Sequence, residues 1–208
     1  MANQPIMTLK AIIFDFGGVL LRTHTRSYRT AWDDKLGLAH GQFEDYIFNG
    51  SVGSLAQLGQ ATWSDIWPQA AEYFGLTSAE IQQAQADFFK GDSLDQDLAD
   101  YIRRLKTHYT IGLLSNTWYP SGEALLRSYN LTDAFDVWVT SAEIGVMKPD
   151  YQIYQVALER TASQPQETIF VDDFAHNIEA AQALGLQTVH YRDPIAARQA
   201  LIALTGVE

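Results

Sequence analysis

Several polar residues that can do chemistry stand at or just after the ends of short apolar runs in this sequence. A carboxylate can attack an electrophile, a hydroxyl can donate a hydrogen bond to an anion, and an ammonium group can neutralise negative charge. The residues lie far apart along the chain, so only the fold can bring them together. They are Asp15, Ser115, Asn116, Lys148, Asp172 and Asp173.

The three aspartates predict a cation site. Carboxylates held close together repel one another unless a hard cation lies among them, and Mg²⁺ is a usual cation for oxygen ligands. A bound Mg²⁺ also attracts a phosphate group and stabilises charge during its transfer. Ser115 and the backbone N–H groups after Asp15 can donate to phosphoryl oxygens, and Lys148 can neutralise charge on the phosphoryl group and on Asp15.

The apolar runs themselves predict the strands of a parallel sheet, because runs without polar alternation are typical of strands covered on both faces. Apolar residues at helical spacing occupy 94–109, 151–162 and 177–185, and Gly185 is typical of a residue that ends a helix. Alternating strands and helices indicate an α/β fold with a doubly wound, Rossmann-like sheet, which binds ligands outside the carboxyl ends of its strands. The predicted strands are 11–16, 110–115, 135–140, 168–173 and, more weakly, 187–191.

Residues 21–92 interrupt this alternation of strands and helices. The segment is rich in aromatic residues, reads as successive helices and is punctuated by glycines. We therefore expect an all-helical inserted cap at 21–92, and a core made of residues 1–20 and 93–208. Most of the aromatic side chains of the insert are expected to form the apolar core of this cap.

The charge and composition exclude several classes of partner. With 25 acidic and 14 basic residues the formal net charge is −11, and such a surface repels nucleic acid and anionic membranes. The absence of cysteine excludes disulfides and thiolate catalysis. No apolar run reaches about 18 residues, and the start MANQPIMTLK lacks the pattern of a secretory signal. We expect a cytoplasmic protein with no membrane or nucleic-acid partner, and the sequence leaves its oligomeric state open.

Four short strings together resemble the motifs of a known family. FDFGGVL, LLSNT, MKPD and FVDDFAHN are similar, in this order, to motifs one to four of the haloacid dehalogenase-like (HAD) hydrolase superfamily. The insert after the first strand resembles the C1-type cap of that superfamily. The resemblance extends over nearly the whole chain, and it implies an enzyme whose aspartate attacks phosphorus or carbon.

The resemblance also implies a role for each matching residue. Asp15 matches the nucleophile, which forms an aspartyl-phosphate in the phosphatases. The Mg²⁺ ligands match Asp15, the carbonyl of Gly17 and Asp173, and Asp172 matches an accessory acid that holds a ligand or a metal-bound water. Residues with the remaining matched roles are Ser115 and Lys148 at the phosphoryl group, and Asn116 and Asn177 in support. Trp118 is a candidate for lining the substrate cleft.

Gly17 departs from the usual family pattern, in which a second aspartate protonates the leaving group. Loss of a positioned acid or base typically costs about 10²–10⁴ in rate. One explanation is that the cap supplies the acid, with His24 better suited by its ordinary pKa than Arg22 or Arg26. A second is a substrate with a good leaving group, such as an acyl or aryl phosphate. A third is dehalogenation, because halide leaves without a proton.

The adjacent carboxylates of the fourth motif favour a metal-dependent enzyme, whereas dehalogenases of this superfamily work without metal. We therefore expect a Mg²⁺-dependent phosphatase acting on a small phosphorylated metabolite. A 2-haloacid dehalogenase with the same nucleophile, Asp15, is the first alternative. A catalytically impaired relative that acts as a binding module is the second, although Asp15, Ser115, Lys148 and Asp173 are all present.

Overall fold

Five parallel strands form the central sheet of the molecule, in the order β5-β4-β1-β6-β7. The structure is a computed structural model that describes residues 8–208, so most of the segment on which the secretory-signal expectation rests lies outside the described residues. The predicted α/β fold with a doubly wound parallel sheet is confirmed. The strands are β1 (Ala11–Phe14), β4 (Thr110–Ser115), β5 (Val137–Thr140), β6 (Thr168–Asp172) and β7 (Gln187–His190).

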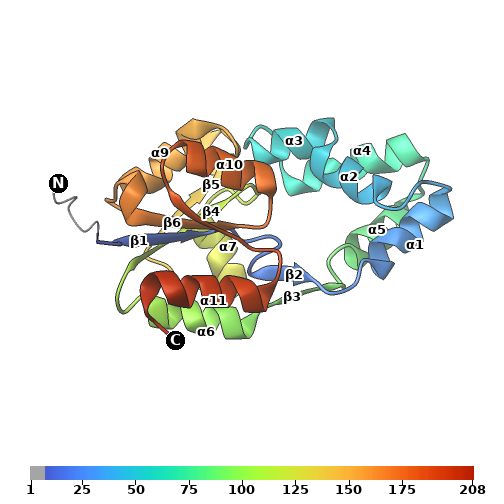
Figure 1. The fold of residues 1–208 in the computed structure, drawn as a ribbon. Helices are drawn as coiled ribbons and strands as arrows, with labels where there is room; N and C mark the ends of the chain where they lie inside the picture. Colours follow the sequence, from blue (N-terminus) through green and yellow to red (C-terminus); the bar gives the residue numbers. More distant parts are fainter. Residues whose placement is uncertain (1–7) are drawn as a thin grey trace.

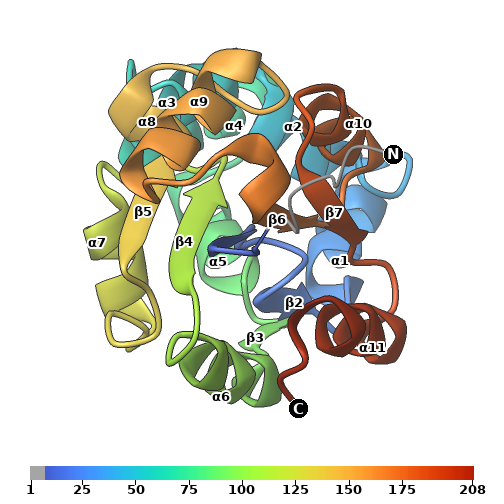
Figure 2. The same ribbon diagram turned by 60° about the vertical axis from the view of Figure 1, so that its left-hand side comes forward.

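Helices cover both faces of this sheet (Figure 1 and Figure 2). Within β1, Ile12 and Phe14 pack on the face covered by α6, α7 and α11, whereas Ile13 packs on the face covered by α9 and α10. This burial on both faces is the physical reason why the strands are continuously apolar in sequence. The helices of the core are α6 (Gln96–Leu105), α7 (Gly122–Ser128), α8 (Ser141–Ile144), α9 (Tyr151–Arg160), α10 (Ala175–Ala183) and α11 (Pro194–Thr205), with a 3₁₀ turn, η1 (Pro165–Glu167).

Gly185 confirms the predicted end of α10. Its φ is +91°, a left-handed conformation that costs glycine little and other residues more. The helix ends at this point, and the chain turns directly into β7.

The segment between β1 and α6 forms a separate helical body, seen beyond the strand ends in Figure 1. Its apolar core contains Trp32, Phe43, Ile47 and Trp67, as expected for an insert that packs on itself. Phe43 and Ile47 are fully buried on α2 with helical spacing, which explains why this helix forms. The helices are α1 (Ser27–Leu36), α2 (Gln42–Asn49), α3 (Ser51–Gln57), α4 (Trp63–Phe74) and α5 (Ser78–Asp87).

The insert is not wholly helical, which corrects the sequence prediction. Two antiparallel strands, β2 (Leu21–Thr23) and β3 (Asp92–Leu94), pair at its base and carry the chain out of the core and back. Each strand has only three residues, too few to show a period of two in the sequence. The predicted cap, 21–92, includes all of β2 but only the first residue of β3. These domain boundaries stay a prediction.

The helical insert also touches the core away from the ribbon. A Cβ at Gly59, which follows α3 and has a φ of +71°, would lie 2.2 Å from the carbonyl oxygen of Ala142 in α8. Only glycine permits this close approach of the two backbones. No helix within residues 8–208 combines the length and apolar character needed to cross a membrane.

Candidate active site

The carboxyl ends of β4, β1 and β6 lie side by side, because β1 pairs with both of its neighbours in parallel register. Phe14 is opposite Leu113 on one side and Val171 on the other. The residues that follow on each strand therefore emerge at the same edge of the sheet. This places Asp15, Ser115 and Asp172 together at the edge where α/β folds bind their ligands.

Lys148 is the centre of the polar cluster at this edge. Its Nζ lies 2.8 Å from Asp15 Oδ1 and 2.7 Å from Asp172 Oδ2, and it donates to the carbonyl of Leu114 at 3.0 Å. The side chain is 1% exposed, so these contacts are shielded from water. Burial by itself would lower the pKa of Lys148, but the two carboxylates outweigh this effect and raise it, so Lys148 stays an ammonium group.

Asn116 fixes the backbone that carries Lys148. Its Nδ2 donates to the carbonyl of Lys148 at 3.0 Å, and its Oδ1 accepts from the N–H of the same residue at 2.9 Å. Both bonds join the loop after β4 to the loop before α9. Asn116 therefore holds the backbone of the lysine in place, and its predicted role in the site stays a prediction.

Asp172 is fully buried, and both of its oxygens already have donors. Oδ1 accepts from the N–H of Phe174 at 2.8 Å, and Asn177 Nδ2 lies 3.0 and 3.1 Å from the two oxygens. The hydroxyl of Tyr154 donates to the carbonyl of Asn177 at 3.1 Å. These bonds orient Asp172 towards Lys148, and its predicted role as a metal ligand stays a prediction.

Asp15 presents one free oxygen to the site. Its Oδ1 accepts from the N–H of Phe16 at 2.7 Å and contacts Lys148, whereas Oδ2 receives no hydrogen bond from residues 8–208. Burial raises the pKa of Asp15 to about 8, opposed by Lys148 and assisted by the nearby charges of Asp172 and Asp173. One ammonium group among three carboxylates leaves this site short of positive charge.

Asp173 has the features of a cation ligand. Its Oδ1 is buried and has no hydrogen-bond partner in the described chain, an arrangement that costs free energy unless a ligand completes it. Burial, followed by the charge of Asp172, raises the pKa of Asp173 to about 6. A Cβ at Gly18 would lie 2.1 Å from Asp173 Oδ2, so the glycine makes room for this carboxylate. Oxygens of Asp15, Asp172 and Asp173 lie within 4.8 Å of one another, which fits an oxygen-liganded cation.

Gly17 lies in the turn between Asp15 and the ribbon, and it has unoccupied space around its Cα. A Cβ built there would meet nothing within 4 Å, and Gly17 does not have the positive φ of its neighbour Gly18. The absent side chain is therefore not enforced by packing or by the backbone. The N–H of Gly18 donates to the carbonyl of Leu21 and closes the turn.

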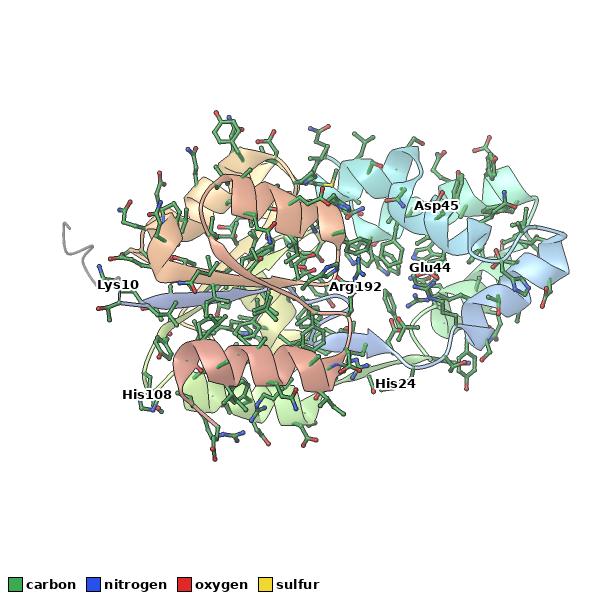
Figure 3. All side chains as sticks on the ribbon, viewed as in Figure 1. Lys10, His24, Glu44, Asp45, His108 and Arg192 are labelled. Carbon is green, nitrogen blue, oxygen red and sulfur yellow. The ribbon has the colours of Figure 1, made fainter. Side chains whose placement is uncertain are left out.

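The other predicted site residues are placed differently. Ser115 is buried at the end of β4. Trp118 extends from the same loop and packs against the aromatic side chains of the insert. His24 is exposed beside the ribbon, where its backbone N–H donates to the carbonyl of Gly91, and Figure 3 shows it on the ribbon rather than within the core. No contact in the described chain joins His24 to the carboxylates, so its role stays a prediction.

One residue of this edge escaped the sequence reading. His190 ends β7, and its Nε2 lies 2.9 Å from the carbonyl oxygen of Asp173. Nε2 is also 3.2 Å from Nε of Arg192, which Figure 3 shows at the side of the core that faces the insert. The weak fifth strand was predicted to end one residue later, at Tyr191, whereas β7 ends at His190, and the rule used for the other strand ends then identifies this histidine.

A family model described as a haloacid dehalogenase-like hydrolase matches residues 9–185. A D-ribitol-5-phosphate phosphatase of Bacteroides thetaiotaomicron is 31% identical over 94% of this chain and 98% of its own length. A sesquiterpene phosphatase of Aspergillus oryzae is 29% identical over 96% of this chain and 98% of its own length. The bifunctional epoxide hydrolase 2 of Sus scrofa is 29% identical over 97% of this chain, which spans only 40% of that protein.

Solved structures share the fold. A HAD family enzyme of Bacteroides thetaiotaomicron, solved as a magnesium complex, superposes with a TM-score of 0.70 at 24% identity, over 86% of this chain and 91% of that one. A dehalogenase superposes with a TM-score of 0.58 at 22% identity, over 90% and 85% of the two chains. At these identities the likeness is one of fold alone.

Proposed function

The chain belongs to the haloacid dehalogenase-like hydrolase family, and from this premise we propose that it is a Mg²⁺-dependent phosphatase acting on a small phosphorylated metabolite. The observation that carries the proposal is the buried Lys148, held between Asp15 and Asp172 beside the unpartnered oxygen of Asp173. A nucleophile, a fixed cation and a vacant carboxylate oxygen are the parts that phosphoryl transfer needs.

Asp15, the carbonyl of Gly17 and Asp173 would hold the Mg²⁺. When bound, the ion would neutralise phosphoryl charge and lower the pKa of Asp15, so that the nucleophile is ionised near neutral pH. Asp172 already accepts bonds from its neighbours, and we assign it the orientation of Lys148 instead. The donors are all oxygens, as Mg²⁺ requires.

In the first step, Asp15 Oδ2 would attack phosphorus as the bond to the leaving oxygen breaks, giving an aspartyl-phosphate. Lys148, which contacts Asp15, would balance charge on the phosphoryl group, and the hydroxyl of the buried Ser115 would donate to a phosphoryl oxygen. In the second step, water would attack phosphorus, break the bond to Asp15 and release inorganic phosphate. Gly17 provides no acid, so the leaving oxygen would take its proton from water or from a group outside the core.

The helical insert, 21–92, would act as the cap over this site. It joins the core through the short ribbon β2–β3 and touches it again through Gly59. A body held in this way can move over the strand ends and exclude water from the reaction. The absence of cysteine and the acidic surface fit a cytoplasmic enzyme without nucleic-acid partners.

Hydrolysis of phosphate esters with and without Mg²⁺ tests this function. We expect release of phosphate that a chelator abolishes, that added Mg²⁺ restores, and that the Asp15→Asn variant lacks. A folded protein that hydrolyses neither phosphate esters nor acetyl phosphate, an acyl phosphate with a good leaving group, would refute the proposal.

Gly17 favours a second candidate, a 2-haloacid dehalogenase. In that reaction Asp15 would attack carbon and displace halide, which needs no proton, so no acid is missing. The unpartnered Asp173 has no evident purpose there, which is why we place this candidate second. Release of halide from a 2-haloacid in the presence of chelator would reverse this order.

A further inference from the structure

Trp118 joins the core to the helical insert through aromatic stacking. Its ring stacks on Trp63 with centroids 4.3 Å apart and on Phe48 at 5.3 Å, and it lies 6.2 Å from Phe89. Every other member of this apolar cluster lies between residues 32 and 89. We refer to Phe48, Trp63, Phe89 and Trp118 as the aromatic wall.

All four side chains of the aromatic wall remain partly exposed, in contrast to the sealed interior of the insert. Aromatic side chains of this size normally bury most of their surface. Their partly exposed faces therefore offer a surface that an apolar group of a ligand can cover. The wall forms where the ends of α2, α4 and α5 meet the loop after β4.

The position of Trp118 relative to the phosphoryl site is fixed by its own loop. Thr117 N–H donates to Ser141 Oγ at 2.9 Å, and Ser141 Oγ donates back to the carbonyl of Thr117 at 3.2 Å. One residue earlier, Asn116 is bonded in both directions to the backbone of Lys148. The backbone that carries Trp118 is therefore fixed two residues from Asn116, which binds the backbone of Lys148.

Arg29, whose guanidinium lies 5.7 Å from the ring of Phe89, is engaged with other groups of the insert. Arg29 donates to Glu44 at 2.8 Å, pairs with Asp92 and donates to the carbonyl of Phe88 at 2.7 Å. Its guanidinium lies over the ring of Phe88, 4.7 Å from the centroid, and near that of Phe89 at 5.7 Å. A substrate rich in hydroxyls needs free donors and acceptors, whereas the donors of Arg29 are engaged and the acceptor of this group without a partner in the described chain, Asp92 Oδ1, is buried.

We propose that the aromatic wall binds the organic part of the substrate, and that the preferred substrates are phosphate monoesters of flat, apolar alcohols such as aromatic ones. This inference rests on the proposed phosphatase function and adds the substrate class. A substrate ring that stacks on Trp118 would lie next to the loop that follows Ser115, and its phosphate would be directed towards Asp15. Trp118 is then a residue that determines specificity.

Benzyl phosphate and ethyl phosphate test the wall, because both release an alkoxide and differ mainly in the ring. We expect kcat/KM for benzyl phosphate to exceed that for ethyl phosphate by about tenfold or more, chiefly through KM, as stacking of one ring predicts. Trp118→Leu keeps an apolar side chain but loses the stack, so kcat/KM for benzyl phosphate should fall more than that for ethyl phosphate, and the preference should drop to within about threefold. Trp118→Phe should retain most of it.

Tyr73→Ala is the matched control, since Tyr73 is an exposed aromatic at the far end of α4 that stacks on Tyr46. It should leave the preference unchanged. Equal losses of kcat for both esters in Trp118→Leu, with an unchanged melting temperature, would mean that Trp118 only joins cap to core, and would overturn the inference. Better turnover of a sugar phosphate than of benzyl phosphate would also overturn it and leave the phosphatase standing. If the protein hydrolysed none of the phosphate esters and not acetyl phosphate either, the proposed phosphatase function itself would be refuted.

Discussion

The polar edge of the core and the aromatic wall of the insert are built in opposite ways. At the polar edge, Lys148 and Asn116 are each held by two or more directional bonds to groups far away in the sequence, and Asp172 is held by Lys148 and by the nearby Asn177. In the aromatic wall, Trp63 and Trp118 are held by ring contacts that tolerate sliding and rotation. The hydrogen bonds of the polar edge fix the positions of individual atoms, whereas the ring contacts of the aromatic wall provide an apolar surface without fixing each ring so closely.

This difference separates two requirements of catalysis. The proposed phosphoryl transfer needs a nucleophile and positive charge in fixed positions, and Asp15 and Lys148 would supply them at a cost in burying charged groups. Binding an apolar organic leaving group needs apolar contact area rather than directional hydrogen bonds, and stacked rings supply that area. Changes at the polar edge should therefore abolish chemistry or stability, whereas changes in the wall should alter the choice of substrate.

The largest effect is expected for Asp15→Asn. An amide of nearly the same shape cannot attack phosphorus, so kcat should fall by about 10⁴-fold or more for every ester. Steady-state release of phosphate measures this fall. The fold should survive, because the substitution removes one of three carboxylates that share a single ammonium group.

Circular dichroism and the melting temperature provide the control for that variant. Residual activity above about a hundredth of the wild-type value would contradict the expected loss and point to a different nucleophile. Equal loss for good and poor leaving groups is also required, since the missing bond to phosphorus affects all of them.

Lys148→Met should have the next largest effect, and on stability as well as rate. It leaves Asp15 and Asp172 buried without a counter-charge, and breaking a buried ion pair from one side costs about 3–5 kcal/mol. Urea unfolding of the metal-free protein measures this change. Lys10→Met is the matched control, because Lys10 is 56% exposed and pairs with Glu167 at the surface. Its effect should stay below about 1 kcal/mol, and equal effects of the two variants would contradict the account of the polar edge.

Most of the core and its polar edge could be predicted from the sequence, because local signals and topology agree there. Apolar runs predicted the strands, and the rule that ligands bind at their carboxyl ends grouped Asp15, Ser115 and Asp172 before any coordinates. The same rule applied to β7 identifies His190. The grouping also brings Asn116 close to Lys148, although it does not predict the two hydrogen bonds between them.

The insert was harder to predict, for a physical reason. Its helices are recognisable, but β2 and β3 are three residues each and pair across a long separation in sequence. The contact of Gly59 with Ala142 depends on how two bodies meet, which no local pattern encodes. Trp118 was identified as a lining residue, but its stacking on Trp63 became clear only in three dimensions.

Mg²⁺ should stabilise the protein in a pH-dependent way. The pKa of Asp15, about 8, and that of Asp173, about 6, lie above the ordinary value of 3.8, so the folded state binds protons more tightly than the unfolded state. The metal-free protein should therefore lose free energy of unfolding as the pH rises from about 4 towards 8. Mg²⁺ replaces those protons, so the rise in melting temperature that it causes should be larger at pH 8 than at pH 5.5.

Thermal unfolding at both pH values, with Mg²⁺ or chelator, measures this difference. At a concentration 100 times its Kd, Mg²⁺ adds about 2.7 kcal/mol, or roughly 5–10 °C for a chain of this size. Asp173→Asn should remove most of the Mg²⁺ effect, whereas Asp133→Asn, an exposed carboxyl paired with Arg103, should preserve it. A shift that is the same at both pH values would show that these carboxyls do not bind the ion.

Gly17→Asp should have the smallest effect and the most selective one. A Cβ at Gly17 would meet nothing within 4 Å and the residue does not have a positive φ, so we expect the backbone to accept an aspartate. As a positioned acid it should raise kcat for esters with poor leaving groups by about tenfold, below the 10²–10⁴ of evolved acids. Esters with good leaving groups gain little, since they need no proton. The slope of log kcat against leaving-group pKa should therefore become flatter.

Gly17→Asn is the control for that slope, because it has nearly the same shape and no acidic proton. It should retain the wild-type slope at saturating Mg²⁺, which separates proton donation from any change in metal binding. If the wild-type slope is already flat, the protein has an acid from elsewhere, and a steeper slope in His24→Ala would locate it on the ribbon. A steep wild-type slope that Gly17→Asp flattens would instead make the missing side chain the reason for a preference for good leaving groups. The polar edge, and not only the aromatic wall, would then restrict the substrates of this enzyme.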